Sequence, residues 1–181
     1  YLDACSNNIT TLDVSNNTAL TYLNISGNNL TELDVTKNTA LTSLDVGSHK
    51  QENENKLTEL DVSNNTALTY LAAKDTKLTT LDVSKNLVLT ELNAAWNVLR
   101  TIDVSKNTNL TYLNVDENNL TTLNVSNTRL SSLRLTGISN LTKLNANNSS
   151  LESIEGLNTL TKLTELDLSN NKISSLNVSK L

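Results

Sequence analysis

The chain has 181 residues and a net charge of -5, with four Tyr and one Trp but no Phe, Pro or Met. This acidic balance disfavours nucleic acid and anionic membranes as partners, because phosphate binding needs clustered Lys and Arg. No apolar run approaches the length of a membrane span, so membrane insertion is not expected.

Leucine motifs return along the chain at a nearly fixed interval. Leu23 and Leu44 stand 21 residues apart, and a similar motif at Leu33 falls between them. Such a period predicts a solenoid, in which each turn packs on its neighbours. Because the repeat covers nearly the whole sequence, we expect a single solenoid domain over residues 1–181. The sequence starts and stops within repeats, so we expect a fragment that lacks its polar caps.

The first half of each turn predicts a short strand. Leu23 and Ile25 alternate with polar residues, which is the period of a strand with one buried face. Asn28 follows, and an Asn recurs at this offset from the strand Leu in other turns: Asn7, Asn97, Asn118 and Asn171. We expect these amides to bond backbone groups at a corner, because buried backbone groups must be paired.

The second half of each turn repeats this pattern. Leu33 and Val35 alternate with polar residues, and Asn38 belongs to a second Asn column. That column comprises Asn17, Asn38, Asn65, Asn86 and Asn107. We therefore predict a mainly β, flattened coil with short parallel strands on both sides and little or no helix.

The full repeat, LxxLxLxxNxLxxLDVSxNxx, resembles the leucine-rich repeat family, in particular bacterial 21-residue repeats and internalin-type surface proteins. Residues 151–173 are similar to a 22-residue internalin-type repeat. The resemblance covers essentially the whole chain. It implies a right-handed leucine-rich repeat solenoid that binds other macromolecules.

Residues 47–56 interrupt the period, because the step from Leu44 to Leu60 stretches to 16 residues. This polar segment contains His49, the one His of the chain. Insertions in repeats form surface loops, so the segment is either a solvated bulge or a partner contact. One His with scattered Glu lacks the ligand spacing of a metal site, and no metal or cofactor is expected.

The order of short and long halves slips near Leu123. Either an extra half has entered, or the half at Leu123 has lost a residue. Since strands must alternate between the two sides, we favour the deletion. The two motif types would then exchange sides after Leu123.

Exposed aromatic residues are the best candidates for a partner-binding site. Tyr22, Tyr70 and Tyr112 precede first-half strand leucines, and Trp96 lies in the corner after such a strand. Tyr and Trp are enriched at interfaces, so we predict a partner-binding set of these four residues with His49. Alternatively, Tyr is only a good strand former that packs on its stacked neighbours.

Two polar columns face outward as well. The Asp column comprises Asp13, Asp34, Asp61, Asp82 and Asp103. Calcium needs six to eight wrapped oxygens, so we expect these carboxylates to bond backbone or Thr rather than a cation ladder. A column of Thr residues leaves ice binding as a remote alternative.

No catalytic constellation is present. Cys5 and His49 have no partner motif, so we expect a non-enzymatic protein. The resemblance implies a monomeric binding module of a bacterial surface or secreted protein, located extracellularly or on the cell surface. Its expected partner is a protein, such as a host or cell-surface receptor, with a glycan as an alternative. A structural spacer within a larger adhesin is the competing interpretation.

Overall fold

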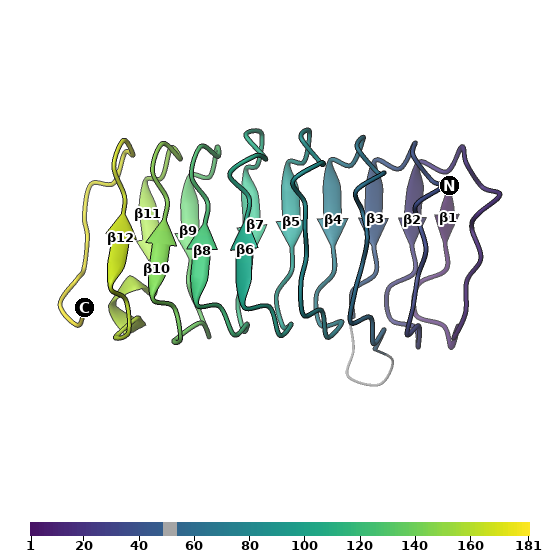
Figure 1. Ribbon diagram of the computed structural model, residues 1–181, viewed down its shortest axis with the longest axis horizontal. Coiled ribbons are helices and arrows are strands. Elements are labelled where there is room, and N and C mark those ends of the chain that lie inside the picture. The colour runs from purple at the N-terminus through teal and green to yellow at the C-terminus, as the bar shows by residue number, and fades with distance from the viewer. Residues whose placement is uncertain (49–53) are drawn as a thin grey trace.

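The computed structural model describes residues 1–48 and 54–181, which form one elongated, flattened solenoid of stacked coils (Figure 1). Each coil places one short segment on either side of a thin core. Among the described residues, no helix is long and apolar enough to cross a membrane. The strands and the one 3-10 helix of the described residues are β1 (Leu2–Asp3), β2 (Tyr22–Asn24), β3 (Ser43–Asp45), β4 (Tyr70–Ala72), β5 (Glu91–Asn93), β6 (Thr101–Asp103), β7 (Tyr112–Asn114), β8 (Thr122–Asn124), β9 (Ser132–Arg134), β10 (Lys143–Asn145), β11 (Ser153–Glu155), η1 (Leu157–Thr159) and β12 (Glu165–Asp167).

The strands form parallel sheets on both sides of the core, as the sequence predicts. Sheet A has the order β1-β2-β3-β4-β5-β7, sheet B has the order β12-β10-β8-β6, and sheet C pairs β11 with β9. Leu23 lies in register with Leu44, 21 residues later, and Leu44 with Leu71. The register therefore equals one repeat per coil, except where the inserted loop lengthens it.

The side of the solenoid that carries the continuous hydrogen-bonded ladder changes along the chain. In the first coils the ladder runs through sheet A, and the facing segments, such as residues 33–35 and 81–83, carry no strand assignment. From β6 onward the continuous ladder is sheet B, and β8 pairs with β6. This pairing confirms that strands keep alternating sides past Leu123.

The exchange of motif types after Leu123 is visible in the corner bonds. Asn171 Nδ2 donates to the carbonyls of Ala146 and Leu168, as Asn97 Nδ2 donates to those of Ala73 and Ala94. The corner of Asn97 follows sheet A, whereas that of Asn171 follows β12 of sheet B. The short motif has therefore moved to the opposite side of the coil.

Aliphatic side chains fill the interior along its whole length. The strand leucines Leu23, Leu44, Leu71 and Leu92 are fully buried. Burying each such side chain contributes about 1.5–3 kcal/mol. One coil cannot offset the entropy of ordering its residues alone, so stability depends on stacking between coils.

The first Asn column satisfies the backbone at the corners between coils. Asn97 Oδ1 accepts the N–H of Leu78 at 2.8 Å, and its Nδ2 donates to Ala73 O at 2.8 Å and Ala94 O at 3.1 Å. The side chain thus joins its own coil to the preceding one. The predicted structural role of these asparagines is confirmed.

The second Asn column makes a different set of bonds. Asn86 Nδ2 donates to Val62 O at 3.0 Å and Asn65 O at 2.9 Å. The Oδ1 atoms of Asn38, Asn65, Asn86 and Asn107 are buried and have no hydrogen-bond partner in the described part of the chain. The two columns are therefore not equivalent, although their spacing from the strand Leu is the same.

The inserted segment rejoins the repeat at Asn55. Asn55 Oδ1 accepts the N–H of Leu30 at 2.9 Å, and its Nδ2 donates to Ile25 O and Val46 O at 2.9 Å each. Asn55 therefore takes the corner position of the first Asn column. His49 lies outside the described residues, so its predicted role in partner binding stays a prediction.

Replacing Asn97 with Ala should lower the free energy of unfolding by about 3 kcal/mol, because buried carbonyls and the Leu78 N–H lose their partner. Chemical denaturation of the purified chain measures this loss. The exposed Asn16 provides a matched Asn→Ala control, which should change stability little. Equal losses for the two variants would contradict the structural role of the column.

Candidate functional site

Sheet A aligns the predicted aromatic residues in one outward row. Tyr22 lies in register with Ser43, Ser43 with Tyr70, Tyr70 with Glu91, and Glu91 with Tyr112. Because neighbouring strands lie about 4.8 Å apart, successive tyrosines of this row are about 10 Å apart. The structure thus brings three of the predicted site residues onto one face.

The tyrosines of this row are not equally exposed. Tyr1 stacks on Tyr22, with ring centroids 4.4 Å apart and planes inclined by 4°. Tyr70 is half-buried, and desolvation is the main cause that raises its pKa above the ordinary value of 10.0, followed by the charges of Asp45 and Glu91. Tyr112 is 48% exposed and offers the largest free surface of the internal tyrosines.

Trp96 extends the aromatic surface to the corner beyond β5. Its side chain is 54% exposed, and its φ is +60°. The equivalent corner position holds Gly27 in an earlier coil, with φ +62°. A bulky residue in this left-handed region is strained by about 1–2 kcal/mol. The equivalent corner residues Ser6, Asp75 and Glu117 have φ of +55° to +57°, so the left-handed conformation belongs to the repeat.

Three aliphatic side chains near β5 in the sequence are also exposed, which the repeat pattern does not predict. Leu87 is 55% exposed, Val88 is 44% exposed and Val98 is 40% exposed. Leu87 and Val88 stand where other coils have Thr39-Ala40 or Thr66-Ala67. This difference between coils could have predicted that the two side chains are exposed. Together with Trp96 and Tyr112 they define the 87–112 patch, which comprises Leu87, Val88, Trp96, Val98 and Tyr112.

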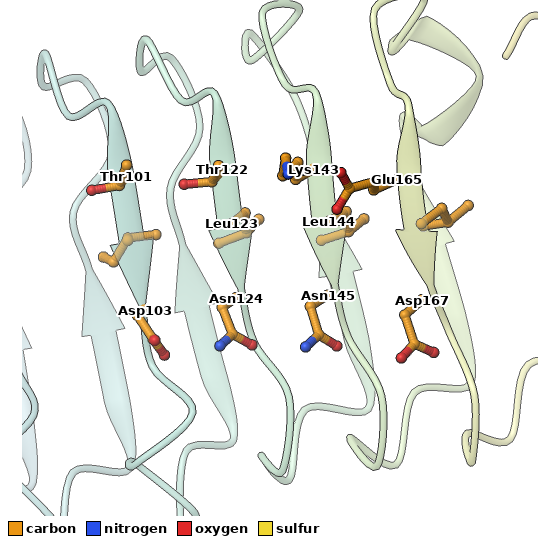
Figure 2. Close-up of a pocket in the computed structure, with 12 residues that line it drawn as sticks. Thr101, Asp103, Thr122, Leu123, Asn124, Lys143, Leu144, Asn145, Glu165 and Asp167 are labelled. Atoms are coloured by element: carbon orange, nitrogen blue, oxygen red, sulfur yellow. Dashed lines mark ion pairs between the residues drawn. The ribbon is translucent and has the colours of Figure 1, made fainter.

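Sheet B carries a second hollow of about 630 Å³ on the opposite side of the solenoid (Figure 2). Its lining has a middle row of aliphatic residues, Ile102, Leu123, Leu144 and Leu166, between two polar rows. One row of its lining contains Thr101, Thr122, Lys143 and Glu165, and the other contains Asp103, Asn124, Asn145 and Asp167. Lys143 Nζ lies 2.6 Å from Glu165 Oε1. No aromatic side chain lines this hollow, so it lacks the stacking platform that an interface or sugar site gains from Tyr or Trp.

The Asp column has the structural role that its spacing predicts. Asp34 Oδ1 accepts the Thr36 N–H at 2.8 Å and the Thr36 hydroxyl at 2.7 Å. The hydrogen bond from the Thr36 side chain, and then that from its backbone, lower the pKa of Asp34 below 3.8. The other carboxylates of the column make the same backbone bond, to Ser15, Ser63, Ser84 and Ser105.

The Thr column is also used within the protein. The hydroxyls of Thr42, Thr69 and Thr90 each donate to the Thr carbonyl of the preceding coil, at 2.9–3.1 Å. These hydroxyl hydrogens are committed to holding coils together. This observation gives no support to the ice-binding alternative.

Side chains that could act as a nucleophile or as metal ligands do not cluster in the described part of the chain. Cys5 is half-buried, and the hydrogen bond with Asp3, followed by desolvation, raises the pKa of its thiol above 9.0. A raised pKa opposes a reactive thiolate. Within residues 1–48 and 54–181, no group of three or more His, Cys, Asp or Glu side chains could hold a metal ion.

Comparisons with known proteins match this geometry. Models of the Leucine Rich Repeat match residues 19–38 and 106–123, and a model of Leucine Rich repeats (2 copies) matches residues 139–180. The functional domain of InlJ from Listeria monocytogenes, described as including a cysteine ladder, is 38% identical with a TM-score of 0.60. The match covers 98% of this chain and 41% of that chain. The chain is a leucine-rich repeat protein.

Two further structures support the same leucine-rich repeat fold. The LRR protein LIC12759 of Leptospira interrogans is 23% identical, with a TM-score of 0.59, over 97% of this chain and 50% of that chain. Internalin C2 of Listeria monocytogenes is 24% identical, with a TM-score of 0.56, over 98% of this chain and 74% of that chain. The leucine-rich repeat chain spans half or less of the length of the InlJ and LIC12759 structures. No curated protein matches it in sequence.

With internalins among its neighbours, this leucine-rich repeat chain is internalin-like, and its fold is in general a scaffold for protein–protein interaction. The chain has no cysteine ladder of the kind named for InlJ, because its sequence contains one cysteine. Asparagine recurs in its corner column, as at Asn97.

Replacing Trp96 with Asn should leave the free energy of unfolding unchanged or raise it by up to about 1 kcal/mol, because Asn tolerates the left-handed conformation. Thermal and chemical denaturation measure this change. A loss of stability larger than about 1 kcal/mol would instead make Trp96 a packing residue.

The unfolding temperature of the leucine-rich repeat chain should fall as the pH drops below about 4. Hydrogen bonds lower the folded-state pKa of Asp13, Asp34, Asp61 and Asp82 below 3.8, so their stabilisation is present above that value. It is lost as the pH falls through the folded-state pKa.

A variant with Asp34→Asn, Asp61→Asn and Asp82→Asn keeps an oxygen for each backbone bond and serves as the matched control. Its unfolding temperature should depend less on pH over the same range. Identical pH profiles for the two proteins would show that the Asp column does not contribute to acid sensitivity.

Proposed function

We propose that this leucine-rich repeat chain is a non-catalytic, monomeric protein-binding module of a bacterial surface or secreted protein. The contact surface is the outward row of sheet A together with the 87–112 patch, with Tyr22 and Tyr70 beside Tyr112 and Trp96. The partner is a protein on a host cell or another cell surface. The likeness to InlJ supports the extracellular, bacterial setting.

The observation that carries the proposal is that the exposed apolar side chains gather in one stretch of the chain, at the two corners that flank β5 and on β7. Away from both ends of the chain, the large hydrophobic residues exposed in the described part all belong to the 87–112 patch. The patch spans two corners and the strands of sheet A between them. Clustered exposed apolar surface on a monomer marks interaction sites, and aromatic anchors dominate binding energy.

Trp96 adds an independent argument. Other coils hold small or polar residues at this left-handed corner, namely Ser6, Gly27, Asp75 and Glu117, whereas here the chain places its largest side chain, half exposed. A role outside the coil explains this choice better than a role in folding.

The proposal can be tested by flow cytometry of the fluorescently labelled chain on cultured epithelial cells. Combined Tyr70→Ser, Trp96→Ser and Tyr112→Ser substitutions should reduce cell binding about tenfold or more, because they remove the aromatic anchors. Protease treatment of the cells should abolish binding, whereas glycosidase treatment should not.

A matched control carries Thr101→Ala, Thr122→Ala and Lys143→Ala on sheet B and should bind as the unaltered chain does. Circular dichroism verifies that both variants fold. Undiminished binding by the folded aromatic variant would contradict the proposed surface. Absence of cell binding by the unaltered chain would favour the spacer interpretation, and glycosidase sensitivity would assign a glycan partner.

A further inference from the structure

Trp96 belongs to a row of corner residues to which each coil contributes one member. Its neighbours in this row are Asp75 in the preceding coil and Glu117 in the next. Asp75 N donates to Ala95 O at 2.9 Å, and Trp96 N donates to Asp116 O at 2.9 Å, so the row advances by one coil at each step. The φ angles of the three residues lie between +55° and +60°. The indole therefore projects from the same corner as two carboxylate side chains, one on either side.

The surface of the indole is available to a partner. The Trp96 side chain is 54% exposed, and among the described residues its ring contacts neither another ring nor a cation. Because neighbouring coils lie about 4.8 Å apart, the Cα atoms of Asp75 and Glu117 are about 10 Å apart with Trp96 between them. Val98, which is 40% exposed, adds an apolar edge two residues after Trp96.

The carboxylate of Asp75 is only partly neutralised by the protein itself. Lys77 Nζ lies 3.5 Å from Asp75 Oδ1 and 3.5 Å from Glu54 Oε2, so two carboxylates share this cation. The Lys77 side chain is 49% exposed, and exposed ion pairs of this kind are weak. Lys74, the residue before Asp75, is half-buried. Asp75 can therefore accept hydrogen bonds from a partner.

The carboxylate of Glu117 is free in the described part of the chain. It is exposed and forms none of the ion pairs of the described residues. It rests over Gly137 of the next coil, where a Cβ atom would collide with it. The neighbouring Arg134 is held by Asp116 instead, at 3.1 Å. Glu117 thus keeps its charge for a partner, and its exposed side chain can turn toward Trp96.

We propose that Trp96, Asp75 and Glu117 form a binding site for an arginine side chain of the protein partner. This inference rests on the proposed function and names the group that the aromatic anchor receives. A guanidinium is planar and stacks on an indole face, which attracts its charge. Its N–H donors then point outward in the plane of the stack, toward the carboxylates beside the ring. The aliphatic stem of the arginine packs on Val98.

The composition of the site favours arginine over other side chains. An acidic side chain would be repelled by Asp75 and Glu117. An apolar side chain would leave both carboxylates unused. A lysine ammonium is a point charge, which cannot stack on the ring and reach carboxylates on both sides of it. Because the sequence contains one Trp, the site occurs once along the chain.

Two-dimensional ¹H–¹⁵N NMR of the ¹⁵N-labelled chain tests the proposal, because the one Trp gives one indole N–H signal. The probe is the acetylated and amidated pentapeptide Gly-Leu-Arg-Leu-Gly, which should shift this signal saturably at millimolar concentration. The same peptide with citrulline in place of arginine keeps the shape and loses the charge. It should bind about tenfold more weakly or not at all. A peptide with lysine in place of arginine should also bind more weakly.

Substitutions that remove charge locate the site on the protein. Asp75→Asn combined with Glu117→Gln should weaken binding of the arginine peptide about fivefold, because two ion pairs are lost. The matched control combines Glu32→Gln with Glu59→Gln, which changes the net charge equally at exposed positions on the opposite side of the coil. It should change the affinity less than about twofold. Circular dichroism verifies that both variants fold.

The proposal is overturned if the indole signal shows no saturable shift, or if the citrulline or lysine peptide binds as tightly as the arginine peptide. Equal weakening by the two double variants also overturns it. Loss of cell binding by the aromatic variant without binding of the arginine peptide would retain the proposed function and reject the arginine site. Binding of the arginine peptide with undiminished cell binding by the aromatic variant would do the reverse.

Discussion

Pairing of backbone groups between successive coils is the constraint on which this solenoid depends. A coil of three-residue strands has few main-chain ladder bonds of its own. At each corner the chain must turn while its carbonyls and N–H groups stay buried, and such groups are costly when unpaired. Asn28, Asn55 and Asn97 meet this requirement by bonding two coils at once. At the exposed positions, Thr hydroxyls bond the preceding coil, whereas Asp carboxylates accept N–H groups within their own coil.

Much of the fold can be predicted from the sequence because this constraint repeats. The Leu23–Ile25 alternation and the Asn28 offset suffice to predict strands, corners and the 21-residue register. Asn55 could also have been found, since it precedes Leu57 by two residues, as Asn28 precedes Leu30. Counting forward from Leu44 misses it because the inserted loop intervenes.

The candidate site is predictable only in part. The Tyr row follows from strand alternation, and Trp96 from its corner position, but the sequence does not report their exposure. Leu87 and Val88 resemble core residues by type, and only comparison with Thr and Ala in neighbouring coils reveals them. The break between β7 and β9 depends on the spacing of coils in space, which residue patterns within one coil do not encode. The roles of the Tyr row, Trp96, Leu87 and Val88 in binding a partner stay predictions.

The interruption beside β7 also affects the mechanics of the molecule. Elsewhere along the first coils, sheet A resists bending by a continuous row of hydrogen bonds. At the β7–β9 step that row is absent, and the continuous ladder is sheet B, which runs through β6, β8 and β10. The two parts of the solenoid are therefore joined by sheet B on one side and, on the other, only by corner bonds such as those from Glu117 N to Thr136 O and from Arg129 N to Leu110 O. Bending at this step is resisted by the ladder of sheet B, as bending of the first coils is resisted by sheet A, so the ladder that bears a load along the molecule passes from one side to the other here.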